Sequence, residues 1–251
     1  MNNNPLVSVV MPVFNKEKYV KQAIESVLNQ TYRNLEIIII DDKSADNSLS
    51  ILENYNSIDK RIRLIKHSRN TGVALTRNDG ILAAKGEYIA LVDADDIWTK
   101  DKIAKQVNLM ITQSADITYC SYGYISNDGD ISRKAFVVPT TTSFNKFLSK
   151  SVFSCSTIMY KSDIAKKYLF DNEYYHEDFV LWCKLLSNDL KAIGDKEILA
   201  YYRLTDDSKA ANKITSAKHR WVAYRKNLKL PMPRAILCFI SYSLNGLIKY
   251  F

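Results

Sequence analysis

The chain has 251 residues, 47% of them hydrophobic, with 16 tyrosines and nine phenylalanines. This suffices for one large α/β domain or two small ones, and it excludes an intrinsically disordered chain. The net charge of +8 is uneven, since residues 1–207 carry 26 Lys or Arg against 27 Asp or Glu, whereas residues 208–251 carry nine basic residues and no acid.

Predicted strands and helices alternate along the first half of the chain. Runs of apolar and β-branched residues predict buried strands over residues 6–13, 35–40, 61–65 and 88–92. Helices are predicted over residues 19–28, 47–55, 72–84 and 100–112, with Asn15 as a cap of the first. Such alternation indicates parallel βαβ units in an open sheet, whose ligands bind beyond the carboxyl ends of the strands.

The pattern changes after residue 113. Stretches with β character at residues 115–126 and 131–138 are joined by Asn127-Asp128-Gly129, which is typical of a hairpin. An amphipathic helix is predicted over residues 177–187. No linker rich in Pro, Gly or Ser separates the two halves, so we expect them to form one domain.

Three of the predicted strands end in polar segments, at residues 12–15, 41–44 and 93–96, which we expect to converge at one edge of the sheet. The last of these, Asp93-Ala94-Asp95-Asp96, places three carboxylates in four residues. A divalent cation with oxygen ligands would relieve their mutual repulsion. The alternative is a solvated turn in which Asp96 or Asp101 caps the next helix. The position of the segment at the end of a buried strand favours the cation.

Further candidate site residues have structural alternatives. A carboxylate of segment 41–44 can accept hydrogen bonds from a nucleobase or a ribose, or it can belong to a turn. Gly72 lets the backbone approach a ligand and Arg77 can face a phosphate or a base, unless this is an ordinary helix start. In His176-Glu177-Asp178, a carboxylate can act as a general base or stabilise the helix N-terminus. No Gly-rich fingerprint follows the first strand, which counts against dinucleotide-binding enzymes.

Taken together, these segments resemble family 2 of the inverting glycosyltransferases, which have the GT-A fold and include enzymes of bacterial surface-polysaccharide (O-antigen or capsule) synthesis. The matching segments are VSVVMPVFNKEKYVKQAIESVLNQTYRNLEIIIIDDKSADNS, RNTGVALTRNDGILAAKGEYIALVDADD and, more weakly, HEDFVLWCKLL. The resemblance implies an α/β fold with a Rossmann-like, mostly parallel sheet flanked by helices and a smaller acceptor-side subregion. It does not extend beyond about residue 205, where the residues themselves predict a C-terminal helical tail. We expect a nucleotide-sugar-binding half (1–113), an acceptor-binding half of the same domain with the catalytic base (114–207) and a basic, partly amphipathic tail (208–251).

The family's motifs also imply roles for particular residues. The donor would be a nucleotide sugar, most often a UDP-sugar, with Asp42 on the uracil and with Pro12, Phe14 and Arg77 lining the nucleotide site. Asp95 would bind a Mn²⁺ or Mg²⁺ ion directly, while Asp93 would bind the sugar, the ribose or a metal-bound water. Asp178 would deprotonate the acceptor, with Glu177 as the alternative base, because the alignment can slip by one residue.

The reaction implied by the resemblance moves one sugar onto a hydroxyl of a glycan or of a polyprenyl-diphosphate-linked glycan. Processive synthases of this family carry Gln-any-any-Arg-Trp, but here Ala217 precedes Arg220-Trp221 and no Gln does. One alternative is a sugar nucleotidyltransferase, although its Gly-rich phosphate loop is missing. A remote alternative is a nucleic-acid-binding protein, suggested only by the basic tail. The body of the chain has no recognised nucleic-acid motif, so no nucleic-acid partner is expected.

The tail itself has two interpretations. Residues 235–251 are mostly apolar, but the run falls short of the about 20 apolar residues that span a bilayer. The tail either packs on the domain as core or lies in the membrane interface. In the second case, which is slightly favoured, residues 218–251 bring Arg225, Lys226, Lys229 and Arg234 to anionic lipid.

The N-terminus and the cysteines bear on location. The polar start Met1-Asn2-Asn3-Asn4 lacks the features of a secretion signal. The four cysteines are widely spaced, which predicts buried thiols in a reducing compartment. We therefore expect a cytoplasmic protein, peripheral on the inner face of the cell membrane where the tail binds lipid.

Overall fold

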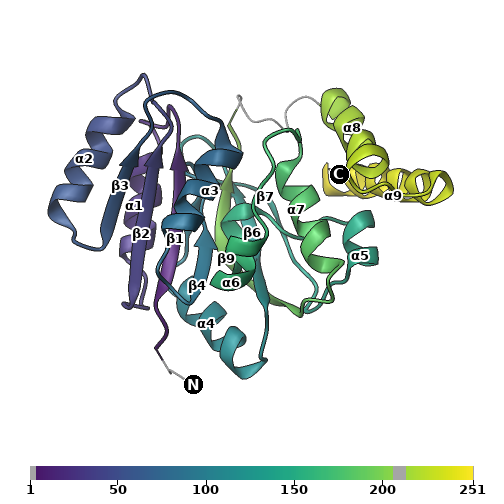
Figure 1. Cartoon of the computed structure of the whole chain (residues 1–251), viewed down its shortest axis with the longest axis horizontal. Coiled ribbons are helices and arrows are strands. Elements are labelled where there is room, and N and C mark those ends of the chain that lie inside the picture. Colours follow the sequence, from purple (N-terminus) through teal and green to yellow (C-terminus); the bar gives the residue numbers. More distant parts are fainter. Residues whose placement is uncertain (1–3, 206–212, 251) are drawn as a thin grey trace.

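One mixed β-sheet runs through the computed structural model, which describes residues 4–205 and 213–250 (Figure 1). The described strands are β1 (Val7–Val13), β2 (Leu35–Asp41), β3 (Ile62–Lys66), β4 (Tyr88–Leu91), β5 (Ile97–Trp98), β6 (Ile117–Ile125), β7 (Ile131–Phe136), β8 (Met159–Lys161) and β9 (Ala192–Arg203). The described α-helices are α1 (Val20–Leu28), α2 (Ser48–Ile58), α3 (Val73–Ala83), α4 (Lys102–Thr112), α5 (Phe144–Ser149), α6 (Ser162–Lys167), α7 (Glu177–Leu186), α8 (Lys213–Val222) and α9 (Met232–Tyr250). A 3-10 helix, η1 (Cys155–Thr157), and a π-helical turn, η3 (Ala223–Asn227), complete them. The strand order is β3-β2-β1-β4-β8-β6-β9-β5, with β7 paired to β6.

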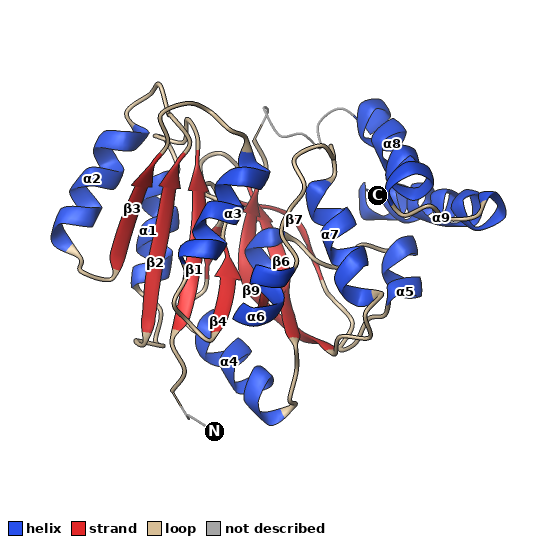
Figure 2. Ribbon diagram, in the orientation of Figure 1, coloured by secondary structure: helices blue, strands red, loops and turns tan. Residues whose placement is uncertain are grey.

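Parallel pairing holds the first half of the sheet together, as the sequence predicts. β2 and β4 run parallel to β1, and β3 runs parallel to β2. All seven residues of β1 are buried, because helices cover both faces of this part of the sheet (Figure 2). Beyond β4 the sheet becomes mixed, since β8 is antiparallel to both β4 and β6 whereas β9 is parallel to β6. The α/β class is therefore confirmed, and the predicted hairpin is β6–β7.

Successive side chains of the central strands enter two different cores, one on each face of the sheet. Val10 and Ile38 belong to the core shared with α3, α5 and α7, whereas Val9 and Ile37 belong to the core shared with α1 and α4. Gly80 lets α3 approach the sheet closely, because a Cβ atom there would lie 2.4 Å from Val10 Cγ1. This close packing fixes the position of α3 and of the side chains that it directs toward the strand ends.

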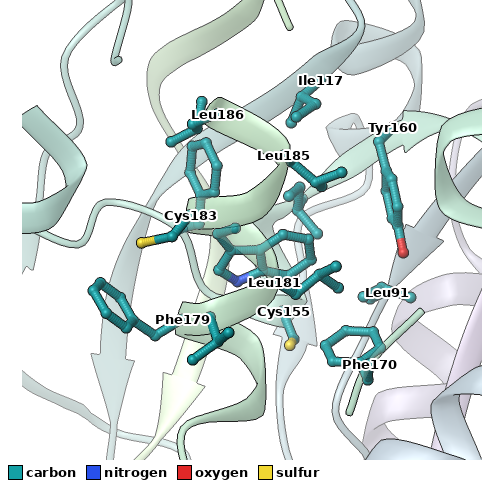
Figure 3. Packing of buried hydrophobic residues seen from close by; sticks show 14 of the residues in the cluster. Leu91, Ile117, Cys155, Tyr160, Phe170, Phe179, Leu181, Cys183, Leu185 and Leu186 are labelled. Carbon is teal, nitrogen blue, oxygen red and sulfur yellow. The ribbon is translucent and has the colours of Figure 1, made fainter. Parts of the chain in front are cut away.

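Helix α7 is buried more completely than the predicted amphipathic pattern implies. Eight of its ten residues are buried, and only Asp178 and Lys184 stay partly exposed. Trp182 makes edge-on contacts with the rings of three aromatic residues from other segments. Figure 3 shows Phe179, Leu181 and Leu185 of this helix among the side chains of the core. Because it is anchored on almost every side, α7 is a rigid support for the residues at its N-terminus.

The loops that follow β1 and β2 are tied to each other at the edge of the sheet. The backbone N–H of Lys16 donates to Ser48 Oγ at 2.7 Å, which links the first loop to the start of α2. Asn15 was predicted to cap α1, and this prediction is wrong. Asn15 has a left-handed backbone (φ +51°), its side-chain oxygen accepts a hydrogen bond from the N–H of Ala45, and α1 begins only at Val20. Asparagine is one of the few residues that tolerate this conformation. Because its side chain bonds to Ala45, Asn15 joins the two loops.

The described part of the tail is helical and forms an arm of α8, η3 and α9 at the end of the molecule far from α2 (Figure 1). One side of this arm contributes Tyr224, Leu230, Ala235 and Cys238 to the core. The arm therefore packs on the domain with one face. Residues 206–212, which include the predicted boundary between the domain and the tail, lie outside the described residues. Among the described residues, no helix combines the length and the apolar character that crossing a membrane requires.

The four cysteines are buried free thiols, as the sequence predicts. Burial raises the pKa of the Cys120 thiol to about 12 and raises that of Cys155 and Cys183 as well. These thiols therefore stay protonated near neutral pH and are not available as nucleophiles.

Candidate active site

A pocket of about 800 Å³ opens where the carboxyl ends of β1, β2 and β4 meet the N-terminus of α7. Its walls contain all of the residues to which the resemblance gives a role: Pro12, Phe14, Asp42, Arg77, Asp93, Asp95, Glu177 and Asp178. The convergence follows from the topology, because parallel strands end at one edge of the sheet. Five segments that are far apart in the sequence thus share one cavity.

Asp42 joins the end of β2 to the start of α3. Its Oδ1 is 2.8 Å from His67 Nδ1 and accepts hydrogen bonds from the N–H and the hydroxyl of Thr71, while Oδ2 accepts one from the N–H of Gly72. Burial would raise the pKa of Asp42, but these hydrogen bonds outweigh it and lower the pKa. A carboxylate offers about four acceptor positions, so Oδ2 retains one for a ligand.

Arg77 links two carboxylates that face the pocket. Its Nη2 lies 2.7 Å from Asp93 Oδ1, and its Nη1 lies 3.3 Å from Glu177 Oε1. Arg77 is 5% exposed, and its guanidinium lies over the ring of Phe170. A side chain held in this way connects α7 to the segment after β4. Arg77 also lines the pocket, and its contact with the nucleotide stays a prediction.

In the segment Asp93–Asp96, here called the acidic turn, other groups of the protein offset the repulsion between the carboxylates. Asp93 is paired with Arg77, and Asp95 Oδ2 lies 2.6 Å from Lys16 Nζ. Asp96 is buried and accepts a hydrogen bond from the N–H of Arg203. Burial, followed by the charges of Asp95 and Asp93, raises the pKa of Asp96 well above its ordinary value. Carboxylate repulsion alone therefore does not require a metal ion here.

The alternative that Asp96 caps the next helix is wrong. α4 begins at Lys102 with Asp101 in the N-cap position, where no side-chain cap hydrogen bond is formed. Asp101 instead accepts a hydrogen bond from the hydroxyl of Thr31. Asp96 faces inward because the turn after β4 is held against the end of β9.

A metal ion at this pocket would need ligands from the donor as well as from the protein. Within the described residues, no group of three or more His, Cys, Asp or Glu side chains is arranged to hold an ion. Magnesium and manganese, however, are commonly bound by one or two carboxylates together with substrate phosphates. Asp95, with Asp93 beside it on the turn, fits that pattern, provided that Lys16 leaves the Asp95 oxygen.

Two residues at the site were missed by the sequence analysis. Lys16 lines the pocket, and burial would lower its pKa, but the charge of Asp95 and the hydrogen bond to it raise the pKa above its ordinary value. Arg203, at the end of β9, donates from Nε to the carbonyl oxygen of Asp95 at 2.9 Å and from Nη2 to Gln22 Oε1 at 2.6 Å. Arg203 also donates to the carbonyl oxygens of Ser126 and Asn127. It therefore positions the acidic turn against the β6–β7 hairpin.

The two candidate bases differ in burial and in their contacts. Glu177 is buried and paired with Arg77, so its carboxylate already serves an internal contact. Asp178 is half-buried, lines the pocket and accepts a hydrogen bond at Oδ1 from the N–H of Phe179 at 2.7 Å. Of the two, Asp178 presents the more accessible carboxylate to the cavity.

Helix α8 closes the pocket on the side of the candidate base. Ser216 lines the cavity, and its carbonyl oxygen lies 3.0 Å from His176 Nε2, which must donate. Burial and the charge of Arg220 lower the pKa of His176, which favours the neutral ring. The ring of Tyr175 stacks on His219 with centroids 4.0 Å apart. Arg220 lies 3.6 Å above the ring of Phe179, which gives it a packing role.

Known proteins resemble this chain in sequence over most of its length. The family described as "Glycosyl transferase family 2" matches residues 8–169. TuaG of Bacillus subtilis, named for teichuronic acid biosynthesis, is 34% identical over 248 residues, which cover 99% of this chain and 98% of TuaG. The UDP-Glc:alpha-D-GlcNAc-diphosphoundecaprenol beta-1,3-glucosyltransferase WfgD of Escherichia coli is 32% identical over 248 residues, with 98% of this chain and 95% of WfgD covered.

Solved structures with the same fold are more distant in sequence. TarS 1–349 of S. aureus in complex with UDP superposes with a TM-score of 0.71 at 19% identity, covering 94% of this chain and 70% of that one. The mannosyltransferase PcManGT of Pyrobaculum calidifontis, in complex with GDP-Man and Mn²⁺, gives a TM-score of 0.74 at 17% identity, covering 96% and 69%. At these identities the similarity shows the fold, and the expected GT-A class is confirmed.

Proposed function

The chain belongs to glycosyl transferase family 2, and we propose that it moves one sugar, with inversion, from a UDP-sugar to a hydroxyl of a polyprenyl-diphosphate-linked glycan. The observation that carries this proposal is the single pocket in which Asp42, the acidic turn and Asp178 meet. WfgD is named for transfer from UDP-Glc to a GlcNAc-diphosphoundecaprenol, which supports the same substrate classes here. Family membership displaces the alternatives of a sugar nucleotidyltransferase and of a nucleic-acid-binding protein.

The nucleoside end of the donor fits the walls formed by β1 and β2. Phe14 is 45% exposed although it is large and apolar, so its ring is available to stack on a planar base. The remaining acceptor position of Asp42 Oδ2 matches the imide N–H of uracil. Pro12 lines the same wall, and its ring limits the space around the base.

The diphosphate belongs beside the acidic turn. A divalent cation would be held there by Asp95 and Asp93 and, when bound, would act as a Lewis acid that stabilises charge developing on the leaving diphosphate. With Asp95 bound to a cation, Lys16 would lose its ion pair with Asp95, and its ammonium group would be available to a phosphate oxygen.

Asp178 completes the reaction as general base. The acceptor hydroxyl gives its proton to the Asp178 carboxylate while its oxygen forms a bond to the anomeric carbon. The bond from that carbon to the diphosphate oxygen breaks on the opposite side, and UDP leaves. An α-linked donor therefore yields a β-linked product. Because the acceptor is carried by a membrane lipid, we place the enzyme at the inner face of the cell membrane.

Removal of the metal, or of its proposed carboxylate, is expected to stop transfer. The purified protein is assayed for UDP release from a panel of UDP-sugars with a GlcNAc-diphospholipid, in Mn²⁺ or Mg²⁺ and after chelation. We expect release to require both the acceptor and the cation, and Asp95→Asn to lower kcat by about 10²–10³. The control is Asp163→Asn, which makes the same change at an exposed position of α6 and should keep wild-type activity.

The same assay can refute the proposal. Full activity in a chelator would exclude the metal, and full activity of Asp95→Asn would exclude that residue as its ligand. Formation of a UDP-sugar from UTP and a sugar phosphate would replace transfer by nucleotidyl chemistry.

A further inference from the structure

The last described helix presents an apolar face to solvent. Met232, Ile236, Leu237, Ile240 and Leu244 are exposed, with Leu237 at 68% and Leu244 at 56%. At 100° per residue these five lie on one side of α9. The opposite side is buried, since Ala235 and Cys238 belong to the core. A helix that is apolar on both sides normally has partners on both, and within the described residues only the inner face has one.

The charges around this face select the kind of partner. Residues 208–251 contain nine basic residues and no acidic one. Lys226 and Lys229 are exposed just before α9, and Arg234 is exposed in its first turn. A protein partner would need a matching acidic rim around an apolar groove. An anionic bilayer offers both properties at once, with negative head groups above an apolar interior.

The dimensions of the helix favour an orientation in the plane of the membrane. No described helix can cross a bilayer. A helix with one face packed on its own domain and the other apolar can instead lie in the interface, with the domain above it and its apolar face among the acyl chains. Basic side chains next to such a face remain at the level of the lipid phosphates.

The arm also connects this face to the pocket. α9 packs on α8 through the edge-on contact of Phe239 with Trp221. α8 in turn supplies Ser216 to the pocket and holds His176, the residue before Glu177 and Asp178. A surface that binds the exposed face of α9 is thereby fixed relative to the candidate base.

We propose that the exposed face of α9 docks in the plane of an anionic lipid bilayer and so holds the acceptor side of the pocket at the membrane surface. The effect of this docking on acceptor binding rests on the proposed function, since a lipid-linked diphosphate presents its sugar at the membrane surface. Lipid binding itself does not depend on it, and the two can be tested separately.

The test is flotation of the full-length protein with vesicles of phosphatidylcholine, with and without phosphatidylglycerol. We expect binding only when phosphatidylglycerol is present, weakened by salt. The double variants Leu237→Ser/Ile240→Ser and Lys226→Ala/Lys229→Ala should each reduce the bound fraction at least about tenfold. The matched control Ile58→Ser/Leu82→Ser removes two equally exposed apolar side chains from α2 and α3 and should bind like the wild type.

Wild-type binding by the α9 variant, or equal binding to neutral vesicles, would overturn the proposal. If the wild type is a dimer by light scattering and the α9 variant a monomer, the face is a contact between two copies of the chain instead. Activity on a water-soluble, short-chain diphosphate acceptor should be unchanged in the α9 variant. If the wild type bound vesicles but had no activity on the soluble acceptor, the proposed function would be contradicted, whereas the docking proposal would still be supported.

Discussion

Asp178→Asn is expected to lower kcat by about 10²–10⁴ without changing the fold, because it removes the group that takes the acceptor proton. Asparagine keeps a side-chain oxygen that can accept the hydrogen bond from the N–H of Phe179, so the start of α7 is preserved. The nucleotide-binding wall is formed by other segments, so the KM for the donor should change little. Steady-state kinetics with thermal unfolding of both proteins measures these expectations.

A matched control lies beyond the other end of the same helix. Asp189 is exposed just beyond the other end of α7, and its left-handed backbone is one that asparagine tolerates. Asp189→Asn should therefore behave like the wild type. A wild-type kcat for Asp178→Asn would remove this residue from catalysis. If Glu177→Gln instead abolished turnover at unchanged stability, Glu177 would be the base.

Arg77→Met is expected to lower the free energy of unfolding by about 3 kcal/mol, because it leaves Asp93 and Glu177 without their shared cation. This value is at the low end for buried ion pairs, since Asp93 is still partly exposed to solvent whereas Glu177 is not. Urea unfolding followed by circular dichroism gives the difference directly.

Two further variants separate charge from packing. Arg63→Met changes an exposed arginine on β3 and should cost no more than about 0.5 kcal/mol. Adding Glu177→Gln to Arg77→Met should recover part of the lost stability, because the buried carboxylate is then neutral. A stability of Arg77→Met within experimental error of the wild type would refute the bridging role of this guanidinium.

The first half of the fold could be predicted because its information is local. Strands such as 6–13 and 35–40 are apolar apart from Ser8 and Glu36, and Asp42 and Asp93 mark the points where two strands stop. Once the strands are placed in parallel, the convergence of their ends follows from topology. The sequence therefore predicted where the pocket lies, although it could not predict any distance within the pocket.

The contacts inside the pocket could not be predicted, because they join residues that are far apart along the chain. Lys16 and Asp95 are separated by 79 positions, and Arg203 and the carbonyl of Asp95 by 108. No local pattern indicates such pairs. The crowding of Asp93, Asp95 and Asp96 was attributed to a missing cation, but Arg77 and Lys16 balance two of these charges and burial favours the neutral form of Asp96.

The extent of burial of helix α7 could not be predicted from the sequence either. Its polar residues at the start and its single lysine near the end give it an amphipathic pattern, yet its surroundings bury eight of its ten residues. Burial from all sides depends on the strands and on α5 that pack around it, which sequence periodicity does not report. The consequence is functional, since the buried helix holds Asp178 at the pocket.

A direct displacement assisted by Asp178 inverts the anomeric carbon. The new glycosidic bond must therefore have the opposite configuration to the bond in the donor. The most direct measurement is the anomeric configuration, by NMR, of the product formed by the wild-type enzyme from an α-linked UDP-sugar and a diphospholipid-linked acceptor. A β-linked product is predicted. An α-linked product, formed with retention, would contradict a single displacement with Asp178 as its base.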